Sequence, residues 1–332
     1  MVADRSLRWG VVGAGRISSA LLEEEDATAR GRIVALASRD SARGRRVLGE
    51  TSEAALFSDY QELVESSEID AVYVGVLHPS HAEVVKMAAR AGKHVLCEKP
   101  MTVSEQDTRA VVEAAVGAGV VLLEAYQYKY QPQTLKLREL IVSGTIGRVL
   151  QVNVGCAFRA EFDPADRLFD RALGGGGILD VGCYPISYVQ LIAAWSAGHA
   201  VSPSAFQGGG SRGVTGTDEW AVATLTYEHG MTALVRSGVR VEDAPELSIY
   251  GELGRIVVRS PWTPGKNGTG GVIEVYRNEE QGLEIVEVPT LPLFGAEMDA
   301  VESAVGDSHV GVDDNEQSIR IAEILDAWQG AF

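Results

Sequence analysis

Cysteine and histidine are scarce in this chain of 332 residues, which has three of the former and six of the latter. The cysteines, Cys97, Cys156 and Cys183, are odd in number and far apart, and the histidines are equally scattered. A disulfide framework needs paired cysteines, and a zinc site needs several ligands at short spacing. The composition therefore favours reduced thiols, as in the cytoplasm, and no metal site.

Positive charge and long hydrophobic runs are lacking too. The 29 basic residues are outnumbered by 46 acidic ones, and the net charge of −17 repels the phosphates of nucleic acids and anionic lipid surfaces. No apolar run approaches the roughly 20 residues of a transmembrane helix, and the N-terminus shows no secretory pattern. We therefore expect a cytoplasmic protein that binds neither nucleic acid nor a membrane.

What is present is the composition of an ordinary enzyme, with 45% hydrophobic and 23% charged residues. A chain of this length exceeds a comfortable single core, so two domains are expected. Over residues 1–125, apolar strands alternate with helical segments, which predicts a Rossmann-type α/β domain with a parallel sheet. Over residues 126–332, closely spaced strands predict an α+β domain with a large, open, mostly antiparallel sheet. Of the elements in this second domain, only the C-terminal helix is predicted as able to pack against the first domain as well.

The expected strands lie at residues 7–12, 32–37, 69–76, 120–124 and from 94 onward in the first domain, and at residues 148–157, 219–227, 231–240, 246–250, 255–258, 272–276 and 284–288 in the second. A glycine turn at residues 174–177 is expected to open a long helix that reaches about Trp195.

The first strand runs into Gly13-Ala14-Gly15-Arg16-Ile17-Ser18 and then into a helical segment. A strand, a glycine turn and a helix in this order are typical of dinucleotide binding, because glycine lets the backbone approach a pyrophosphate at a helix N-terminus. The third glycine of that fingerprint is Ser18 here, so the motif by itself is only moderately specific.

The second strand ends in Ser38-Arg39-Asp40, where an NAD-binding chain would place an acid directly at the strand tip. A hydroxyl and a guanidinium instead suit the 2′-phosphate of NADP. We therefore expect NADP(H), with NAD(H) the less favoured cofactor, and we interpret Asp40 as the N-cap of the next helix.

Glu98-Lys99-Pro100 ends the apolar strand that begins at His94. Open α/β sheets bind ligands beyond the carboxyl ends of their strands, and proline cannot continue the sheet. A charged pair at this point therefore predicts site residues. His78 and His81 follow the strand at residues 69–76 and also lie at a strand tip.

In the second domain, Asp180 and Tyr184 follow the glycine run. They are four residues apart, so on a helix they share one face and can act as a proton-transfer pair. Arg167, ahead of the glycine run, and Tyr126 are weaker candidates for substrate contact. A surface salt bridge and a packed core aromatic are the competing interpretations of these two residues.

With these motifs placed, the chain resembles the Gfo/Idh/MocA oxidoreductases over nearly its whole length. The resemblance rests on the loop from Gly13 to Ile17, the stretch from Ala91 to Pro100, Glu124-Ala125-Tyr126 and the glycine run up to Tyr184. It implies that Lys99 and Tyr184 carry the acid/base chemistry, that Lys99 also approaches the nicotinamide ribose, and that the bond before Pro100 is cis. The expected cofactor contacts are Gly13, Gly15, Arg16, Ile17, Ser38, Arg39, His78, His81, Glu98 and Lys99, and the expected substrate contacts are Tyr126, Arg167, Asp180 and Tyr184.

Tyr184 stands where many inositol-dehydrogenase-like members of the family have histidine. The chain is therefore most similar to the branch that contains dihydrodiol dehydrogenase, NADP-dependent xylose dehydrogenase and glucose-fructose oxidoreductase. Its His78-Pro79-Ser80-His81 loop is similar to the dihydrodiol dehydrogenase version. Lys129 and Gln131 depart from the Arg-Phe-His-Pro or Arg-Phe-Phe-Pro common in relatives, which bears on substrate specificity more than on the type of reaction.

The expected reaction is hydride transfer between NADP(H) and a secondary alcohol or hemiacetal carbon of a sugar or cyclic diol, with Tyr184 as the acid/base. A free tyrosine has a pKa of ~10, too high for a general base at neutral pH. A lysine ammonium about 5 Å away, at an effective dielectric of roughly 20, would favour the phenolate by about 3 kcal/mol, or roughly 2 pK units. Lys99 is assigned this role. Asp180 would oppose it if it lay equally close, so we assign Asp180 to orienting the substrate hydroxyl or Lys99.

Two other functions stay open. A ketoreductase of a nucleotide-linked deoxysugar can carry the same tyrosine, and it would need a pocket for a diphosphonucleoside. A non-catalytic regulator that senses NADP is disfavoured because Lys99, Asp180 and Tyr184 are all retained and no basic arm is present. For either enzyme, the open sheet of the second domain has a face to cover, which predicts a homodimer or a higher homo-oligomer.

Overall fold

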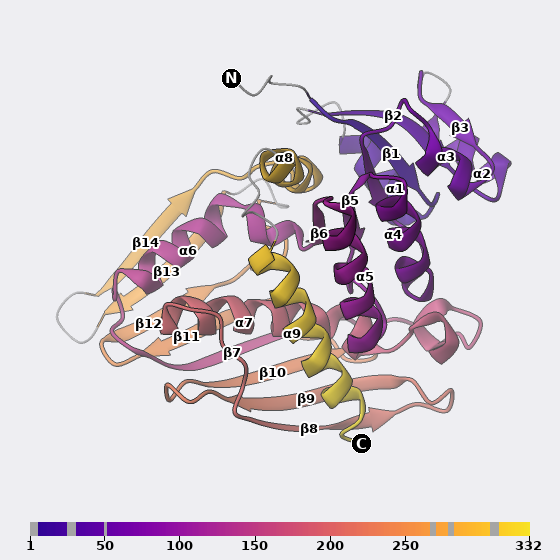
Figure 1. Ribbon diagram of the computed structural model, residues 1–332. Helices are drawn as coiled ribbons and strands as arrows, with labels where there is room; N and C mark the ends of the chain where they lie inside the picture. Colours follow the sequence, from indigo (N-terminus) through magenta and orange to yellow (C-terminus); the bar gives the residue numbers. More distant parts are fainter. Residues whose placement is uncertain (1–5, 25–30, 50–51, 266–269, 278–281, 306–311) are drawn as a thin grey trace. The chain divides into compact units, whose positions relative to one another are not determined.

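The computed structural model describes residues 6–24, 31–49, 52–265, 270–277, 282–305 and 312–332. The chain forms two compact units, one from residues 1–127 and 292–319 and the other from residues 128–291 and 320–332. Figure 1 labels the elements of both units. Residues 292–319, which the sequence analysis assigns to the second domain, thus belong to the first unit.

The first unit is built on a six-stranded sheet in which every neighbouring pair of strands is parallel, in the order β3-β2-β1-β4-β5-β6. The strand order reverses between β1 and β4, and such a switch point is where open α/β sheets bind ligands. The predicted Rossmann-type sheet is confirmed. Its strands are β1 (Arg8–Val12), β2 (Arg32–Ala37), β3 (Ala55–Phe57), β4 (Ala71–Val74), β5 (His94–Glu98) and β6 (Leu122–Ala125).

Helices follow the strands of this sheet and pack against it, α3 on β1 and β2, α4 on β4 and β5, and α8 on β5 and β6. The N-termini of α2, α3 and α5 are capped by side chains that accept backbone N–H groups, those of Asp40, Asp59 and Ser104. The predicted role of Asp40 is thus correct. The helices are α1 (Arg16–Glu24), α2 (Ser41–Leu48), α3 (Tyr60–Glu65), α4 (His81–Arg90), α5 (Glu105–Ala118), α8 (Leu293–Val305) and the first part of α9 (Val312–Gln329).

The two extremes of burial in this sheet are β4 and β3. All four residues of β4 are fully buried, as expected of a strand covered on both faces. The three residues of β3 are exposed or half-buried at the sheet edge, so no pattern of hydrophobic residues marks the strand. The sequence analysis accordingly does not contain β3.

The second unit holds an eight-stranded sheet in the order β14-β13-β12-β11-β7-β10-β9-β8. Every neighbouring pair is antiparallel except β7 and β10, which are parallel. The predicted large, mostly antiparallel sheet is confirmed. Its strands are β7 (Val149–Ala157), β8 (Ala205–Arg212), β9 (Asp218–Thr226), β10 (Thr232–Gly238), β11 (Leu247–Gly251), β12 (Gly254–Val258), β13 (Gly271–Arg277) and β14 (Leu283–Val288).

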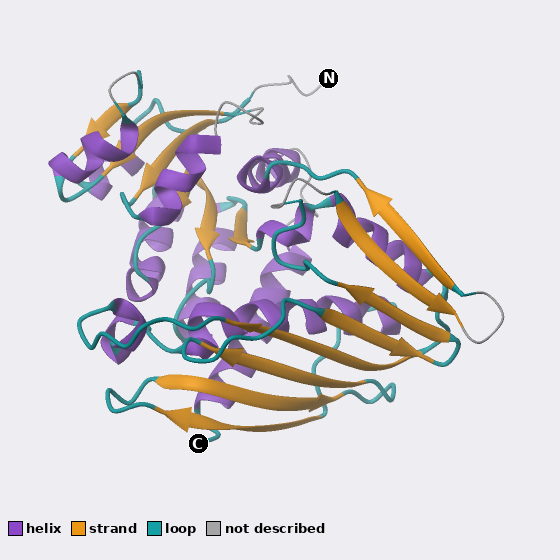
Figure 2. Cartoon of the chain, turned by 180° about the vertical axis from the view of Figure 1, so that it is seen from behind, coloured by secondary structure: helices purple, strands orange, loops and turns teal. Residues whose placement is uncertain are grey.

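One face of this sheet carries α6 (Pro132–Val142) and α7 (Cys183–Ala197), which lie against the sheet in Figure 1. Figure 2, seen from behind, shows the strands in front of these helices, with their other face toward the viewer. β9 shows the alternation that follows: Ala221 and Ala223 are buried on the helix side, whereas Trp220 and Val222 are 45% and 39% exposed on the other.

β8 is a second strand that the sequence analysis does not contain, because three consecutive glycines, residues 208–210, are typical of a turn. Because glycine has no side chain, other residues of the protein pack closely against this strand. A Cβ on Gly208 would lie 2.9 Å from the Trp328 side chain, and one on Gly210 would lie 2.7 Å from Phe332. The glycines of β8 thus make room for the C-terminal residues of the chain.

The long helix predicted after the glycine run is present, with one difference. Its first turn, Ile178–Gly182, is π-helical, and α7 follows directly. By length and composition, residues 171–197 are apolar enough to cross a membrane, but the most apolar part is 89% buried inside the protein. The segment therefore serves as the core helix of the second unit.

Candidate active site

The loop between β1 and α1 carries the first two glycines of the dinucleotide fingerprint. Gly13 has a φ of +104°, which L side chains rarely adopt, and a Cβ there would lie 2.6 Å from the carbonyl oxygen of Gly75. A Cβ on Gly15 would meet only that same oxygen, at 3.7 Å. The protein's own packing thus requires glycine at residue 13 but not at residue 15, which fits a backbone kept bare for a pyrophosphate.

Ser18, in place of the third glycine, is fully buried in α1. That glycine allows close packing of the helix on the sheet, and here Gly75 provides the room instead. A Cβ on Gly75 would lie 2.7 Å from Oγ of Ser18 and 3.3 Å from Ile17. The glycine that allows close packing of helix and sheet thus lies directly after β4, at Gly75, and not in α1, so Ser18 is compatible with the fingerprint.

At the end of β2, the two residues expected at the 2′-phosphate have different surroundings. Ser38 is 4% exposed, and its hydroxyl donates to the carbonyl oxygen of Asp40 at 2.7 Å. Arg39 is exposed, and its guanidinium lies 5.6 Å from the centre of the Tyr60 ring, within cation–π distance. Arg39 is therefore the more accessible of the two.

A hollow of about 470 Å³ lies beside the same loop, between α1 and α2. Three arginines line it, Arg16 of α1 and Arg43 and Arg46 of α2, together with Glu23. Within the described part of the chain, none of the three guanidinium groups forms an ion pair. Arg43 and Arg46 were not predicted from the sequence. The available signal was a run of basic residues directly after the second strand in an otherwise acidic chain.

Lys99 follows the last residue of β5, and the peptide bond between it and Pro100 is cis, as the family resemblance implies. Glu98 is 8% exposed, and its carboxylate accepts hydrogen bonds from the Tyr73 hydroxyl at 2.5 Å and from the backbone N–H of Lys99 at 3.3 Å. Tyr73 belongs to the neighbouring strand β4. The Glu98 carboxylate is thus fixed in place beside Lys99.

The histidines near this loop are buried. His81 is fully buried, with Nδ1 2.9 Å from the carbonyl oxygen of Pro100 and Nε2 3.1 Å from that of Val76. Burial lowers the pKa of His81. Because both ring nitrogens face backbone oxygens, neither is left for a cofactor, and the structure does not support the contact expected of His81. His78 packs edge-on against His81, with ring centroids 5.7 Å apart, and its cofactor contact stays a prediction.

In the second unit, Asp180 lies in the π-helical turn and is 5% exposed. Arg167 donates from Nη1 to its Oδ1 at 2.9 Å, and the arginine side chain is 42% exposed. Arg167 therefore forms the salt bridge that was the competing interpretation, and its contact with substrate stays a prediction. The ion pair offsets the charge of a carboxylate that would otherwise be costly to bury.

The glycine run is held against β9 and β10. Asp218 accepts a hydrogen bond from the Ile178 N–H at 2.6 Å, and Ser237 donates to the carbonyl oxygen of Gly177 at 2.6 Å. A Cβ on Gly177 would lie 2.8 Å from Cα of Gly238, so this approach needs glycine. Asp218 is 4% exposed, and burial raises its pKa to about 6. Asp218 was not predicted from the sequence, because a single acidic residue in a strand has no pattern that marks it as a site residue.

Tyr184 stands at the start of α7 in a cluster of four aromatic rings. Its centroid is 5.4 Å from that of Trp262 and 6.3 Å from that of Tyr128, which stacks on Tyr188 at 4.2 Å. Tyr128 and Tyr188 are fully buried, and burial raises the pKa of both phenols, so both stay protonated. Tyr184 is half-buried, and of the three tyrosines it is the one with exposed surface.

Tyr126 and the two residues that depart from the family pattern make internal contacts. Tyr126 is 3% exposed, so its ring is packed as a core aromatic, and its contact with substrate stays a prediction. Gln131 is fully buried, and its Oε1 accepts a hydrogen bond from the Leu291 N–H at 3.0 Å. Nζ of Lys129 lies 5.9 Å from the centre of the Tyr130 ring.

Lys99 belongs to the first unit, whereas Asp180 and Tyr184 belong to the second. That the three side chains meet around one reacting carbon stays a prediction. In the described ranges, no group of three or more His, Cys, Asp or Glu side chains is placed to hold a metal ion.

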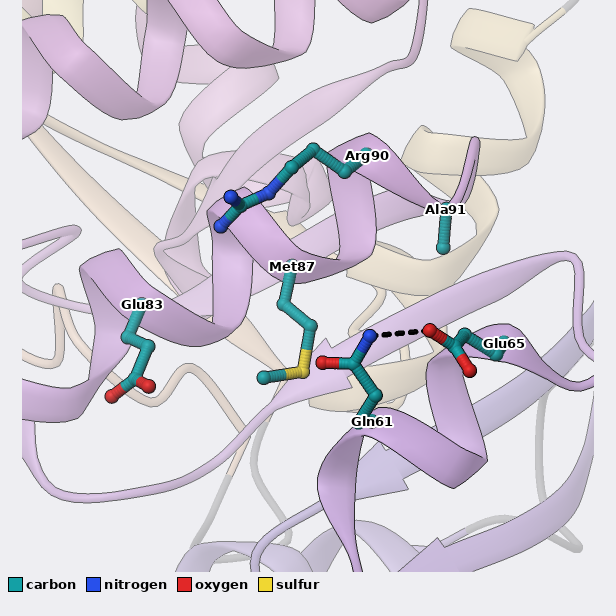
Figure 3. A pocket seen from close by; sticks show the side chains of 6 residues that line it. All are labelled: Gln61, Glu65, Glu83, Met87, Arg90 and Ala91. Atoms are coloured by element: carbon teal, nitrogen blue, oxygen red, sulfur yellow. Dashed lines mark hydrogen bonds between the residues drawn. The ribbon is translucent and has the colours of Figure 1, made fainter.

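A second hollow, of about 440 Å³, lies between α3 and α4 (Figure 3). Gln61 and Glu65 of α3 are joined by a hydrogen bond on one side, and Glu83, Met87 and Arg90 of α4 line the other. The lining contains none of the predicted site residues and mixes charges of both signs. We therefore assign no ligand to it.

Comparison of the chain with models of protein families identifies its family. Residues 7–126 match the family model described as "Oxidoreductase family, NAD-binding Rossmann fold", and residues 134–257 match that of the "GFO/IDH/MocA C-terminal domain". The chain belongs to the Gfo/Idh/MocA oxidoreductase family. The predicted family is confirmed, and with it an oxidoreductase that carries an NAD-binding domain.

Named relatives of this family member include dehydrogenases of diols and sugars. It is 32% identical to a trans-1,2-dihydrobenzene-1,2-diol dehydrogenase of Danio rerio, over 80% of this chain and 79% of the relative. It is also 32% identical to a D-xylose 1-dehydrogenase (NADP+) of Haloferax volcanii, over 74% of this chain and 72% of the relative. Among solved structures, a 3-ketoreductase from Actinomadura kijaniata in complex with NADP and TDP-benzene is 25% identical, with a TM-score of 0.86 and 98% of each chain covered.

Proposed function

We propose that this protein is an NADP-dependent oxidoreductase that transfers a hydride between the nicotinamide and a secondary alcohol or hemiacetal carbon of a sugar or cyclic diol. The observation that carries the proposal is a buried, ion-paired Asp180 one helical turn before a half-buried Tyr184. The relatives named as dihydrodiol and xylose dehydrogenases support a diol or a sugar as the substrate.

Tyr184 is assigned as the acid/base that takes the hydroxyl proton in the oxidation direction. The phenol needs a cation to lower its pKa from ~10, and Lys99 is assigned that role. Arg167, 2.9 Å from the Asp180 carboxylate, offsets the negative charge that would oppose the phenolate. Asp180 is assigned to orienting the substrate hydroxyl or Lys99.

The bound cofactor supplies the hydride chemistry, and the protein holds and orients it. Two features of the first unit fit this group: the glycine turn at Gly13 and the hollow lined by three arginines. We propose Arg43 and Arg46 as additional contacts to the 2′-phosphate, and we leave out His81 because both of its ring nitrogens face backbone oxygens. The other proposed contacts are Gly13, Gly15, Arg16, Ile17, Ser38, Arg39, His78, Glu98 and Lys99.

The substitution Tyr184→Phe tests the acid/base assignment. General acid–base catalysis contributes about 10²–10⁴-fold in rate, so we expect kcat to fall by about that factor, with D-xylose and a trans-dihydrodiol as the first substrates tried. The dissociation constant of NADPH, measured by fluorescence titration, should change less than threefold. Tyr188→Phe, one helical turn further along α7, is the matched control and should keep its kcat. Full turnover by Tyr184→Phe would overturn the assignment.

A ketoreductase acting on a nucleotide-linked deoxysugar is the second candidate. The solved 3-ketoreductase with TDP-benzene and NADP, which covers 98% of this chain, is the observation that favours it. Initial rates with NADP(H) on a panel of free sugars, diols and sugar nucleotides separate the two functions. Turnover confined to the sugar nucleotides would indicate the ketoreductase. Tight NADPH binding without turnover of any substrate in the panel would indicate the third possibility, a non-catalytic regulator that senses NADP.

We also propose a homodimer or a higher homo-oligomer, joined through the face of the eight-stranded sheet opposite α6 and α7. The exposed apolar side chains Trp220, Val222, Leu283 and Ile285 lie on strands of that sheet. None of the three cysteines forms a disulfide among the described residues, in keeping with the cytoplasmic location that we propose.

A further inference from the structure

The four residues Glu98–Met101 carry Lys99 at the end of β5, and buried side chains from neighbouring elements bind this segment on both sides of the lysine. On the N-terminal side, the bond from the Tyr73 hydroxyl to the Glu98 carboxylate is 2.5 Å long, and Tyr73 is fully buried in β4. A short bond between a phenol and a carboxylate is of the strong, charge-assisted kind. The position of Glu98 is therefore set from inside the sheet.

On the C-terminal side, the His81 ring lies between two backbone carbonyl groups. Its ring nitrogens lie 2.9 Å from the carbonyl oxygen of Pro100 and 3.1 Å from that of Val76. His81 is the first residue of α4 and has no exposed surface. Burial keeps the imidazole neutral, so it carries one N–H, and we assign that donor to the closer carbonyl oxygen, that of Pro100, the residue after Lys99.

Glu124 of β6 binds the next residue along. Its Oε1 accepts a hydrogen bond from the Met101 N–H at 2.8 Å, and its Oε2 accepts one from the Ser318 hydroxyl of α9 at 2.6 Å. Glu124 and Ser318 are each 5% exposed. The carboxylate therefore connects the lysine segment to a helix 194 residues further along the chain.

A buried carboxylate is a costly way to satisfy one backbone N–H, because a neutral acceptor would serve with less desolvation. What a carboxylate adds is strength and direction in both of its hydrogen bonds. The pKa of the Cys97 thiol is raised by its burial and then by the charges of Glu124 and Glu98, as expected of two carboxylates close to the residue two positions before Lys99. A precise position of the segment Glu98–Met101, which carries Lys99, would justify the desolvation cost of the buried Glu124 carboxylate.

We propose that Tyr73, His81 and Glu124 form a positioning clamp that holds the backbone on both sides of Lys99 and so aims its amine. The proposal rests on the role assigned to Lys99 under the proposed function. It gives His81 a part in orienting the lysine in place of the cofactor contact expected from sequence. None of the three clamp residues touches the reacting atoms; each acts through the segment that carries Lys99.

The test compares Glu124→Ala, which removes the acceptor for the Met101 N–H, with Glu124→Gln, whose amide oxygen can still accept that bond. Because small misplacements of catalytic groups cost up to about 100-fold, we expect Glu124→Ala to lower kcat by about 10- to 100-fold while the NADPH dissociation constant stays within threefold. Glu124→Gln should recover kcat to within about threefold of wild type. Val111→Ala, a truncation in the buried face of α5, is the control for general destabilisation and should keep its kcat.

A second readout does not depend on turnover. Hydrogen exchange of the peptide that contains the Met101 amide, measured by mass spectrometry with NADPH bound, should speed up at least tenfold in Glu124→Ala and little in Glu124→Gln. Unchanged exchange in Glu124→Ala overturns the clamp, as does an unchanged kcat in a protein that Lys99→Met inactivates. If Lys99→Met itself keeps full turnover, the proposed role of Lys99 fails, and the exchange measurement still decides whether the clamp exists.

Discussion

At the scale of single residues, Glu297 has surroundings that disfavour a negative charge. It lies on α8, has no exposed surface, and neither of its carboxyl oxygens has a hydrogen-bond partner among the described residues. Its pKa is raised well above the usual value, first by burial and then by the negative charges of Glu98 of β5 and Glu24 of α1. Glu297 therefore keeps its proton in the folded protein.

This proton makes stability depend on pH in a direction opposite to that of an ordinary carboxylate. The folded protein retains the proton while the unfolded chain releases it near pH 4.5, so the free energy of unfolding falls by about 1.4 kcal/mol per pH unit above that value, until the buried group itself ionises. The substitution Glu297→Gln removes this pH dependence of the free energy of unfolding. Urea unfolding at pH 5, 6 and 7 should show the variant gaining on wild type by about 1–3 kcal/mol over the range.

Glu113→Gln, an exposed substitution on α5, is the matched control, and its difference from wild type should not depend on pH. A constant difference between Glu297→Gln and wild type from pH 5 to pH 7 would show that Glu297 is ionised in the folded state.

Residues in contiguous motifs could be found from the sequence, whereas those that act through distant partners could not. Glu98 and Lys99 were singled out because they end a recognisable strand, and Tyr184 because it closes a recognisable glycine run. Asp218 holds Ile178 across 40 residues, and Glu124 meets Ser318 across 194, distances over which no local pattern extends. His81 was predicted as a cofactor contact from its strand-tip location, but location does not say which way a side chain points.

At the scale of elements, the helices and long strands followed from hydrophobic periodicity, and the exceptions have physical reasons. β3 is short and poorly buried, and β8 is rich in glycine, so neither carries the pattern by which strands are recognised. α8 packs in the first unit, and its partner there could not be predicted from the sequence. Glu24 of α1 caps its N-terminus by accepting the Phe294 N–H at 2.6 Å, a contact between residues 270 positions apart.

α2 contributes two of the three arginines that line the hollow beside the glycine loop, Arg43 and Arg46. Arg43→Gln and Arg46→Gln should each weaken NADPH binding by about 10- to 100-fold, since a charged hydrogen bond to phosphate contributes about 1.5–3 kcal/mol. NADH lacks that phosphate, so its dissociation constant should change less than threefold. Fluorescence titration of both cofactors measures the preference directly.

Arg45→Gln is the matched control, because Arg45 is exposed on the same helix but does not line the hollow. Equal losses of NADPH and NADH affinity in Arg43→Gln would show that α2 contributes general charge and no specificity.

At the scale of the whole molecule, the eight-stranded sheet has one face against helices and one that carries exposed apolar side chains. Trp220 and Val222 of β9 are 45% and 39% exposed, and Leu283 and Ile285 of β14, at the opposite edge, are 50% and 57% exposed. Exposed apolar positions thus lie on two strands near opposite ends of the strand order. A surface of this kind is covered most simply by the same surface of a second copy related by a two-fold axis.

The proposed dimer has to form against electrostatic repulsion, since each copy carries a net charge of −17. Sedimentation velocity at 0.15 M salt should therefore show twice the chain mass of 35.4 kDa, and lowering the ionic strength should shift the equilibrium toward monomer because screening weakens. Trp220→Asp, which places a charge in the apolar face, should give monomer at all salt concentrations. Val116→Asp introduces the same charge at a 63% exposed position of α5 in the other unit and should leave the dimer intact. If wild type sediments as a monomer at every salt concentration, the exposed face of the sheet does not associate with itself and the apolar residues on it need another explanation.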